Sequence, residues 1–186
     1  MREAQIKKAL ADHLVSQQSA QQHSFIEELR LHGGEVRADL VHVEQMHCFE
    51  IKSEADSLAR LITQGSRYTL IFDRITLVLA QRHVAKAIEM LPPWWGVLVL
   101  EAGTSQFVTL REAGVNVRHR ADSLASVLTK DEALHILEGA GVTRGWRSKS
   151  LYLIQQHIAQ MFPVEELRQH IREALLIRAE KTLLAH

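Results

Sequence analysis

Two short, almost uninterrupted apolar runs constrain the fold of this chain most strongly. They are Arg74–Ala80 and Gly96–Leu100. A strand can be apolar along its length when helices cover both faces of its sheet, which is typical of parallel strands in α/β proteins. A short helical pattern, His83–Leu91, lies between the two runs and is ended by Pro92 and Pro93. The sequence therefore predicts two buried strands joined by a helix.

Further strands and helices surround this pair. Alternating or continuous apolar patterns predict strands, whereas apolar residues at helical spacing predict helices. The expected strands are 36–43, 47–52 and 106–110, and the expected helices are 2–16, 24–29, 54–71, 123–128, 130–138, 148–161 and 164–184. We therefore predict an α/β domain over residues 1–120, with a mixed sheet flanked by helices, and an all-helical extension over residues 121–186.

Composition limits what such a domain can do. The 186 residues include 22 basic and 22 acidic side chains, so the whole molecule has no net charge that would attract nucleic acid or membranes. The single cysteine, Cys48, excludes a disulfide framework and a structural zinc site built on several thiolates. No stretch reaches the roughly 18 apolar residues of a membrane-spanning helix, and the polar start is unlike a signal peptide. We expect a cytoplasmic protein without membrane contacts.

Three charged residues lie where the strands are expected to be buried. Glu50 and Lys52 are two residues apart, so both side chains leave the same face of their strand. Asp39 lies in the preceding strand among apolar residues. Burial of such charges is costly unless they are paired or bind a metal. The plainest interpretation is a salt-bridged Glu50–Lys52 pair at the rim of the sheet.

A hairpin between the two strands would decide whether Asp39 joins this pair. Asp39 and Glu50 share a face if the connection has an even number of residues or contains a bulge. Glu44-Gln45, or the four residues Glu44–His47, would satisfy this condition, and a regular three-residue loop would not; the sequence does not choose between them. Two carboxylates and a lysine suit phosphodiester hydrolysis, because carboxylates hold Mg²⁺ and the metal activates a water.

The spacing of these residues resembles the motif of the PD-(D/E)xK nuclease superfamily. Asp39, ten intervening residues and Glu50-Ile51-Lys52 match it, with Ala38 in place of the proline. Gln64-Gly65-Ser66-Arg67-Tyr68 resembles the QxxxY motif of the RecB-like and Cas4-like branch. An uncharacterised bacterial family assigned to this superfamily is similar in three further segments, Phe49–Ser53, Phe72–Val78 and Pro93–Gly96.

This resemblance implies a restriction-endonuclease-like fold and a Mg²⁺- or Mn²⁺-dependent deoxyribonuclease. Asp39, Glu50 and the backbone carbonyl of Ile51 would be metal ligands, and Lys52 would be the catalytic lysine. Gln64 and Tyr68 of the QxxxY motif would contact DNA or orient the site. The alternative is that they are an exposed glutamine and a half-buried tyrosine. The alternative function is a catalytically inactive nuclease fold that serves as a DNA-binding or protein-assembly module, for example in phage defence or mobile elements.

The superfamily often has a further acidic residue in the helix before the hairpin, here Glu27 or Glu28. Ser24-Phe25-Ile26-Glu27 fits a capping box, in which Glu27 bonds back to the N–H of Ser24. Glu28 is therefore the better candidate for an additional ligand of the metal site, although the sequence leaves the choice open.

The densest basic run lies in the helical extension. Arg144, Arg147 and Lys149 could grip phosphates while Trp146 stacks on a base or sugar, although a polar loop with a tucked-in tryptophan is the plainer interpretation. DNA is the expected partner, and a homodimer or a larger protein assembly would suit double-strand cutting or recruitment.

The last expected helix combines an apolar stripe with many charges. Arg168 and Arg172 share this helix with several glutamates. The sequence favours a solvated, salt-bridged surface there rather than a DNA-binding face.

Overall fold

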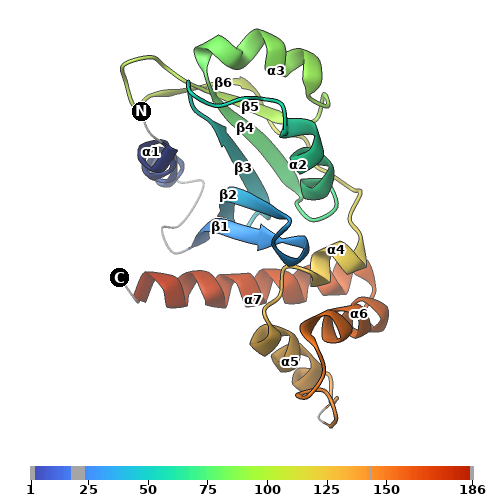
Figure 1. Cartoon of the computed structure of the whole chain (residues 1–186). Helices are drawn as coiled ribbons and strands as arrows, with labels where there is room; N and C mark the ends of the chain where they lie inside the picture. The colour runs from blue at the N-terminus through green and yellow to red at the C-terminus, as the bar shows by residue number, and fades with distance from the viewer. Residues whose placement is uncertain (1–2, 18–23, 143, 185–186) are drawn as a thin grey trace.

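The computed structural model describes residues 3–17, 24–142 and 144–184 of the chain. Within these residues a six-stranded mixed sheet has the strand order β1-β2-β3-β4-β5-β6 (Figure 1). The strands are β1 (Phe25–Leu31), β2 (Val36–His42), β3 (His47–Lys52), β4 (Arg74–Ala80), β5 (Gly96–Leu100) and β6 (Phe107–Arg111). The pairs β3–β4 and β4–β5 are parallel, and the other three neighbouring pairs are antiparallel. The predicted α/β class with a mixed sheet is confirmed.

Helices cover both faces of the central strands, as the apolar runs predict. They are α1 (Glu3–Ser16), α2 (Leu61–Tyr68), α3 (Val84–Met90), α4 (Ala121–Ala125), α5 (Lys130–Gly139), α6 (Leu151–Met161) and α7 (Val164–Leu184), with short 3-10 helices at His32–Gly34 and Gln81–His83. Ile6 and Leu10 of α1 pack against Phe49 and Ile51 of β3 on one face of the sheet. The helices α2 and α3 lie on the other face (Figure 1). The two faces of β3 therefore have different surroundings.

The helical extension begins at α4 and packs against the sheet domain. Leu124 of α4, Ile154 of α6 and Leu175 of α7 belong to the same hydrophobic cluster as Tyr68 of α2. The long helix α7 runs beside β1 at one edge of the sheet (Figure 1). The core of the sheet on its α2 side is therefore continuous with the core of the extension. None of the described helices is long and apolar enough to cross a lipid bilayer.

A carboxylate just before β4 joins the extension to the sheet. Asp73 lies 2.7 Å from a guanidinium nitrogen of Arg168, 3.0 Å from His119 Nε2 and 3.5 Å from Arg172. Burial would raise the pKa of Asp73, but hydrogen bonds from His119 and Arg168 outweigh this effect and lower it. Both arginines are salt-bridged as predicted, but they are only partly exposed and share a partner outside their helix, because local charge patterns do not reveal which helix face docks on the sheet domain.

The segment before the hairpin is a strand and not the predicted helix. Phe25–Leu31 pairs antiparallel with β2, with Leu29 opposite Ala38. Leu29 and Leu31 are buried, and the exposed Arg30 lies between them, which is the two-residue period of a strand. The predicted capping box at Ser24 is wrong for the same reason. Pairing with β2 overrides the local helical preference.

The helix predicted over residues 54–71 is shorter in the structure. It spans Leu61–Tyr68, and turns occupy most of residues 54–60. The backbone N–H and the hydroxyl of Ser53 donate to Asp56 Oδ2 at 2.7 and 2.6 Å. Neither residue caps the helix, because Arg60 occupies its N-cap position. These turns carry the chain from the end of β3 to a helix that faces it.

Candidate active site

The hairpin of β2 and β3 brings Asp39 and Glu50 to the same level of the sheet. Its last backbone pair is Leu40 with Phe49, so Asp39 and Glu50 occupy the next opposed positions. The connection consists of the four residues 43–46. An even number of residues is the condition for this alignment.

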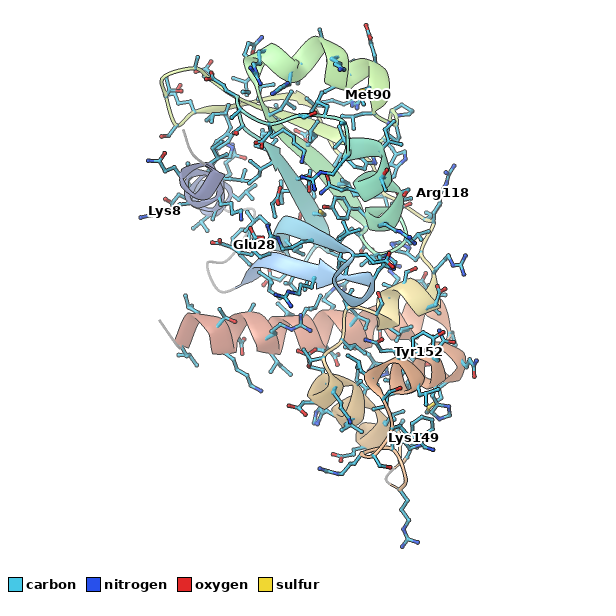
Figure 2. The ribbon with its side chains drawn as sticks, viewed as in Figure 1. Lys8, Glu28, Met90, Arg118, Lys149 and Tyr152 are labelled. Atoms are coloured by element: carbon cyan, nitrogen blue, oxygen red, sulfur yellow. The ribbon has the colours of Figure 1, made fainter. Side chains whose placement is uncertain are left out.

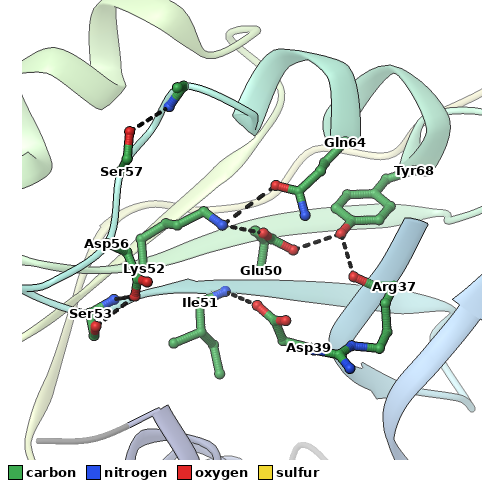
Figure 3. Close-up of polar contacts among 11 residues, drawn as sticks. Arg37, Asp39, Glu50, Ile51, Lys52, Ser53, Asp56, Ser57, Gln64 and Tyr68 are labelled. Atoms are coloured by element: carbon green, nitrogen blue, oxygen red, sulfur yellow. Dashed lines mark hydrogen bonds and ion pairs between the residues drawn. The ribbon is translucent and has the colours of Figure 1, made fainter. Parts of the chain in front are cut away.

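The carboxylate of Asp39 accepts a hydrogen bond in place of a backbone carbonyl of the sheet. The N–H of Ile51 donates to Asp39 Oδ2 at 2.7 Å (Figure 3). The regular pairing between β2 and β3 ends one position earlier, so the carboxylate supplies the acceptor that a neighbouring strand would otherwise provide. Asp39 is thereby fixed beside the peptide group that joins Glu50 to Ile51.

Glu50 is the centre of a buried polar network. The residue is 0% exposed, which is unusual for a glutamate. Its Oε1 lies 2.6 Å from Nζ of Lys52, and its Oε2 accepts a hydrogen bond from the hydroxyl of Tyr68 at 2.7 Å (Figure 3). Lys52 also donates to Oε1 of Gln64 at 3.5 Å. These donors compensate for the loss of hydration that burial imposes on the carboxylate.

The QxxxY segment forms the wall of this network. Gln64 and Tyr68 are one turn apart on α2, and both point toward β3 (Figure 3). The hydroxyl of Tyr68 also lies 2.8 Å from the carbonyl oxygen of Arg37. Burial raises the pKa of Tyr68 far above its ordinary range, and the carboxylate of Glu50 raises it further. The hydroxyl of Tyr68 therefore stays protonated and donates a hydrogen bond to Glu50.

Glu28 has different partners from those expected. It lies on β1 instead of a helix and has a positive φ of 56°, which is rare for a residue other than glycine. Its carboxylate forms ion pairs with Lys7 of α1 and with Arg37 of β2. The alternative residue, Glu27, is exposed. The structure thus does not bring Glu28 into the network around Glu50.

Lys7 was not singled out by the sequence, although a signal for it exists. It lies between Ile6 and Leu10, which are the buried residues of the apolar stripe of α1. Lys7 itself is 6% exposed, so its stem shares that face and its amine needs an anionic partner. A lysine next to a buried apolar stripe can therefore indicate an ion pair with the sheet against which the helix packs.

The basic run of the extension lies far from this site. Trp146 stacks on His157 with ring centroids 4.1 Å apart, so its ring is engaged within the extension. Arg147 pairs with Glu138 at 2.7 Å. Lys149 extends from the end of the extension most distant from the sheet, well away from Glu28 (Figure 2). The structure therefore does not bring the predicted nucleic-acid-binding residues of this run, Arg144, Arg147 and Lys149, to the site around Glu50.

The donor atoms at the site match a hard divalent cation in type. Asp39 and Glu50 supply carboxylate oxygens, and Ile51 supplies a backbone carbonyl on the same strand. Within the described parts of the chain, no three His, Cys, Asp or Glu side chains converge as metal ligands. Mg²⁺ is commonly held by one or two carboxylates and keeps several waters, so two carboxylates fit this metal.

Comparisons with known proteins identify one family. A family model described as Bacteriophage P4 protein cII matches residues 1–184. Protein cII of Enterobacteria phage P4 is 27% identical over 146 residues, which cover 77% of this chain and 55% of that relative. The chain thus spans about half the length of this curated relative.

A solved structure is also similar. It is the SPO1766 protein of unknown function from Silicibacter pomeroyi, with a TM-score of 0.45 and 21% sequence identity over 81% of this chain and 97% of that one.

Proposed function

This chain belongs to the bacteriophage P4 protein cII family, and we propose that it hydrolyses DNA phosphodiester bonds with the help of Mg²⁺ or Mn²⁺. The proposal rests on one observation. A fully buried glutamate, Glu50, is bonded both to Lys52 and to the Tyr68 hydroxyl, next to a second carboxylate on the neighbouring strand.

A purely structural role does not explain why these buried residues are charged. Replacement of a buried ion pair by apolar residues of similar size is often neutral or stabilising, so a buried pair is weak evidence for a stabilising function. The strand neighbours Phe49 and Ile51 pack in an ordinary apolar core on the other face. A functional site is therefore the better explanation of why Glu50 and Lys52 are charged.

Each residue of the candidate active site would have a defined part in the reaction. Asp39, Glu50 and the carbonyl of Ile51 would hold the cation. A cation bound there would supply an activated water and neutralise phosphate charge. Lys52 would stabilise the negative charge that develops on the phosphate. Gln64 would orient the amine of Lys52, as their 3.5 Å contact suggests.

The test is cleavage of supercoiled plasmid and of an end-labelled single strand, with Mg²⁺, Mn²⁺ or EDTA. Glu50→Gln keeps the size and the tyrosine contact of the side chain, and Lys52→Met keeps the aliphatic stem. Glu54→Gln and Lys86→Gln change exposed residues of the same types and serve as matched controls. We expect metal-dependent cleavage that the first two variants abolish and the two controls retain. Equal activity in all five proteins would contradict the proposal.

The second candidate is an inactive nuclease fold that binds DNA. The observation that favours it is the engagement of Glu28 by Lys7 and Arg37, which leaves two carboxylates at the site. Binding of labelled DNA at low salt in EDTA, without cleavage when Mg²⁺ or Mn²⁺ is added, would support this candidate. Either function would place the protein in the cytoplasm, where it would meet DNA.

A further inference from the structure

A small cavity lies on the face of the sheet opposite Glu50. It has a volume of about 180 Å³ and lies between α1, the hairpin and the strands β4 to β6. His13 of α1, His47 of β3, and Arg74 and Arg111 of the flanking strands are among its lining residues. Phe49, whose face of β3 is packed by α1, also lines it, so the cavity is separated from the candidate active site by the sheet.

The two arginines bring positive charge to the cavity. Nη1 of Arg74 donates to the carbonyl of Ala113 at 2.8 Å, and Nε of Arg111 donates to the carbonyl of Trp95 at 2.6 Å. Among the described residues, the hydrogen bonds of both guanidinium groups go to carbonyl oxygens and neither group forms an ion pair. Carbonyl oxygens fix the orientation of a guanidinium but do not cancel its charge.

The histidines add hydrogen-bonding groups to this positive surrounding. His47 Nε2 lies 2.8 Å from Oγ1 of Thr76. Burial lowers the pKa of His47 to about 3, and the charge of Arg74 contributes to that lowering. His42, also a lining residue, is 2% exposed, and its Nε2 is 3.5 Å from a carboxylate oxygen of Glu44. Glu112 is the one carboxylate among the described lining residues.

We propose that this cavity binds a small free oxyanion of the size and charge of inorganic phosphate. The cavity offers about 180 Å³ between these donors, which is room for a tetrahedral oxyanion. Two fixed guanidinium groups and several imidazole and hydroxyl groups are the donors that a phosphate uses in proteins. The site is independent of the proposed nuclease activity, because it shares no residue with it.

Binding of inorganic phosphate to the full chain would be measured by calorimetry, in EDTA and at constant ionic strength. Arg74→Gln removes a charge but keeps a donor for the Ala113 carbonyl. His13→Phe keeps the ring contact with Phe107, whose centroid is 5.2 Å away. We expect saturable binding that each variant weakens at least tenfold. Arg118→Gln is the control, since Arg118 is exposed and lines no part of this cavity, and it should bind within twofold of the wild type.

A second measurement uses the unaltered protein. Phosphate should shift the imidazole NMR signals of His13 and His42 and leave His157 unchanged, because His157 stacks on Trp146 in the extension. Absence of saturable binding, equal weakening by Arg74→Gln and Arg118→Gln, or shifts at all three histidines would overturn the proposal. Equal or tighter binding of a 5′-phosphorylated oligonucleotide that Arg74→Gln weakens would also overturn it, since the proposal assigns the site to a small free oxyanion.

Discussion

Replacement of Tyr68 by phenylalanine removes one hydroxyl group from the network that holds Glu50. The ring of Tyr68 is 0% exposed and remains in place, so the change creates no large cavity. It removes a 2.7 Å hydrogen bond to a buried carboxylate, and a hydrogen bond to a charged group contributes roughly 1.5–3 kcal/mol. We therefore expect the free energy of unfolding to fall by about 2 kcal/mol, which lowers the melting temperature by roughly 4–8 °C for a chain of this size.

Urea unfolding followed by circular dichroism measures this loss. Tyr152→Phe is the matched control, because Tyr152 is 65% exposed and its hydroxyl forms no bond in the described structure; it should stay within about 0.5 kcal/mol of the wild type. Glu50→Met, which removes both carboxylate oxygens, completes a double-mutant cycle with Tyr68→Phe. We expect a coupling energy between roughly 0.5 and 3 kcal/mol, as for residues in direct contact. A loss below 0.5 kcal/mol for Tyr68→Phe, or strict additivity, would refute the argument that the tyrosine holds Glu50.

Three further changes test other parts of the fold. Asp73→Asn leaves the cations of the extension without their carboxylate and should lower the free energy of unfolding by about 3 kcal/mol in urea titrations. His47 has a pKa near 3 in the folded protein and about 6.5 when unfolded, so the unfolded chain binds the extra proton as the pH falls. Stability should therefore decline below pH 6.5 by up to about 1.4 kcal/mol per unit from this group, and His47→Gln should flatten the decline between pH 7 and 5. Gly65→Ala places a Cβ 2.7 Å from the buried ring of Trp95 and should cost about 1–3 kcal/mol, whereas Gly139→Ala, with open space around it, should not destabilise the protein.

The sequence predicts the central part of the sheet well because burial there is two-sided. Arg74–Ala80 and Gly96–Leu100 are almost entirely apolar, and the structure has β4 and β5 at these bounds. The strand β1 was not predictable in the same way. Phe25–Leu31 contains two glutamates and an arginine, and it lies at the edge of the sheet, where only some of its side chains are buried. Its conformation depends on pairing with β2, which a local pattern does not contain.

The parts of the candidate site that follow from local periodicity are predictable. Glu50 and Lys52 share a face because strand side chains alternate, and Gln64 and Tyr68 share one because they are a helical turn apart. That the two pairs meet depends on the turns after β3, which set where α2 begins. The partners of Glu28 depend on even longer-range packing, because they come from α1 and from β2.

The register of β3 separates the two proposed sites and explains how one short strand can serve both. His47, Phe49 and Ile51 are odd-numbered and face α1, where His47 lines the cavity and the other two pack against the helix. Glu50 and Lys52 are even-numbered and face α2. Because side chains alternate strictly along a strand, pairing with β4 in this register fixes both faces at once. The charge of each face can therefore change by substitution without disturbing the chemistry of the other.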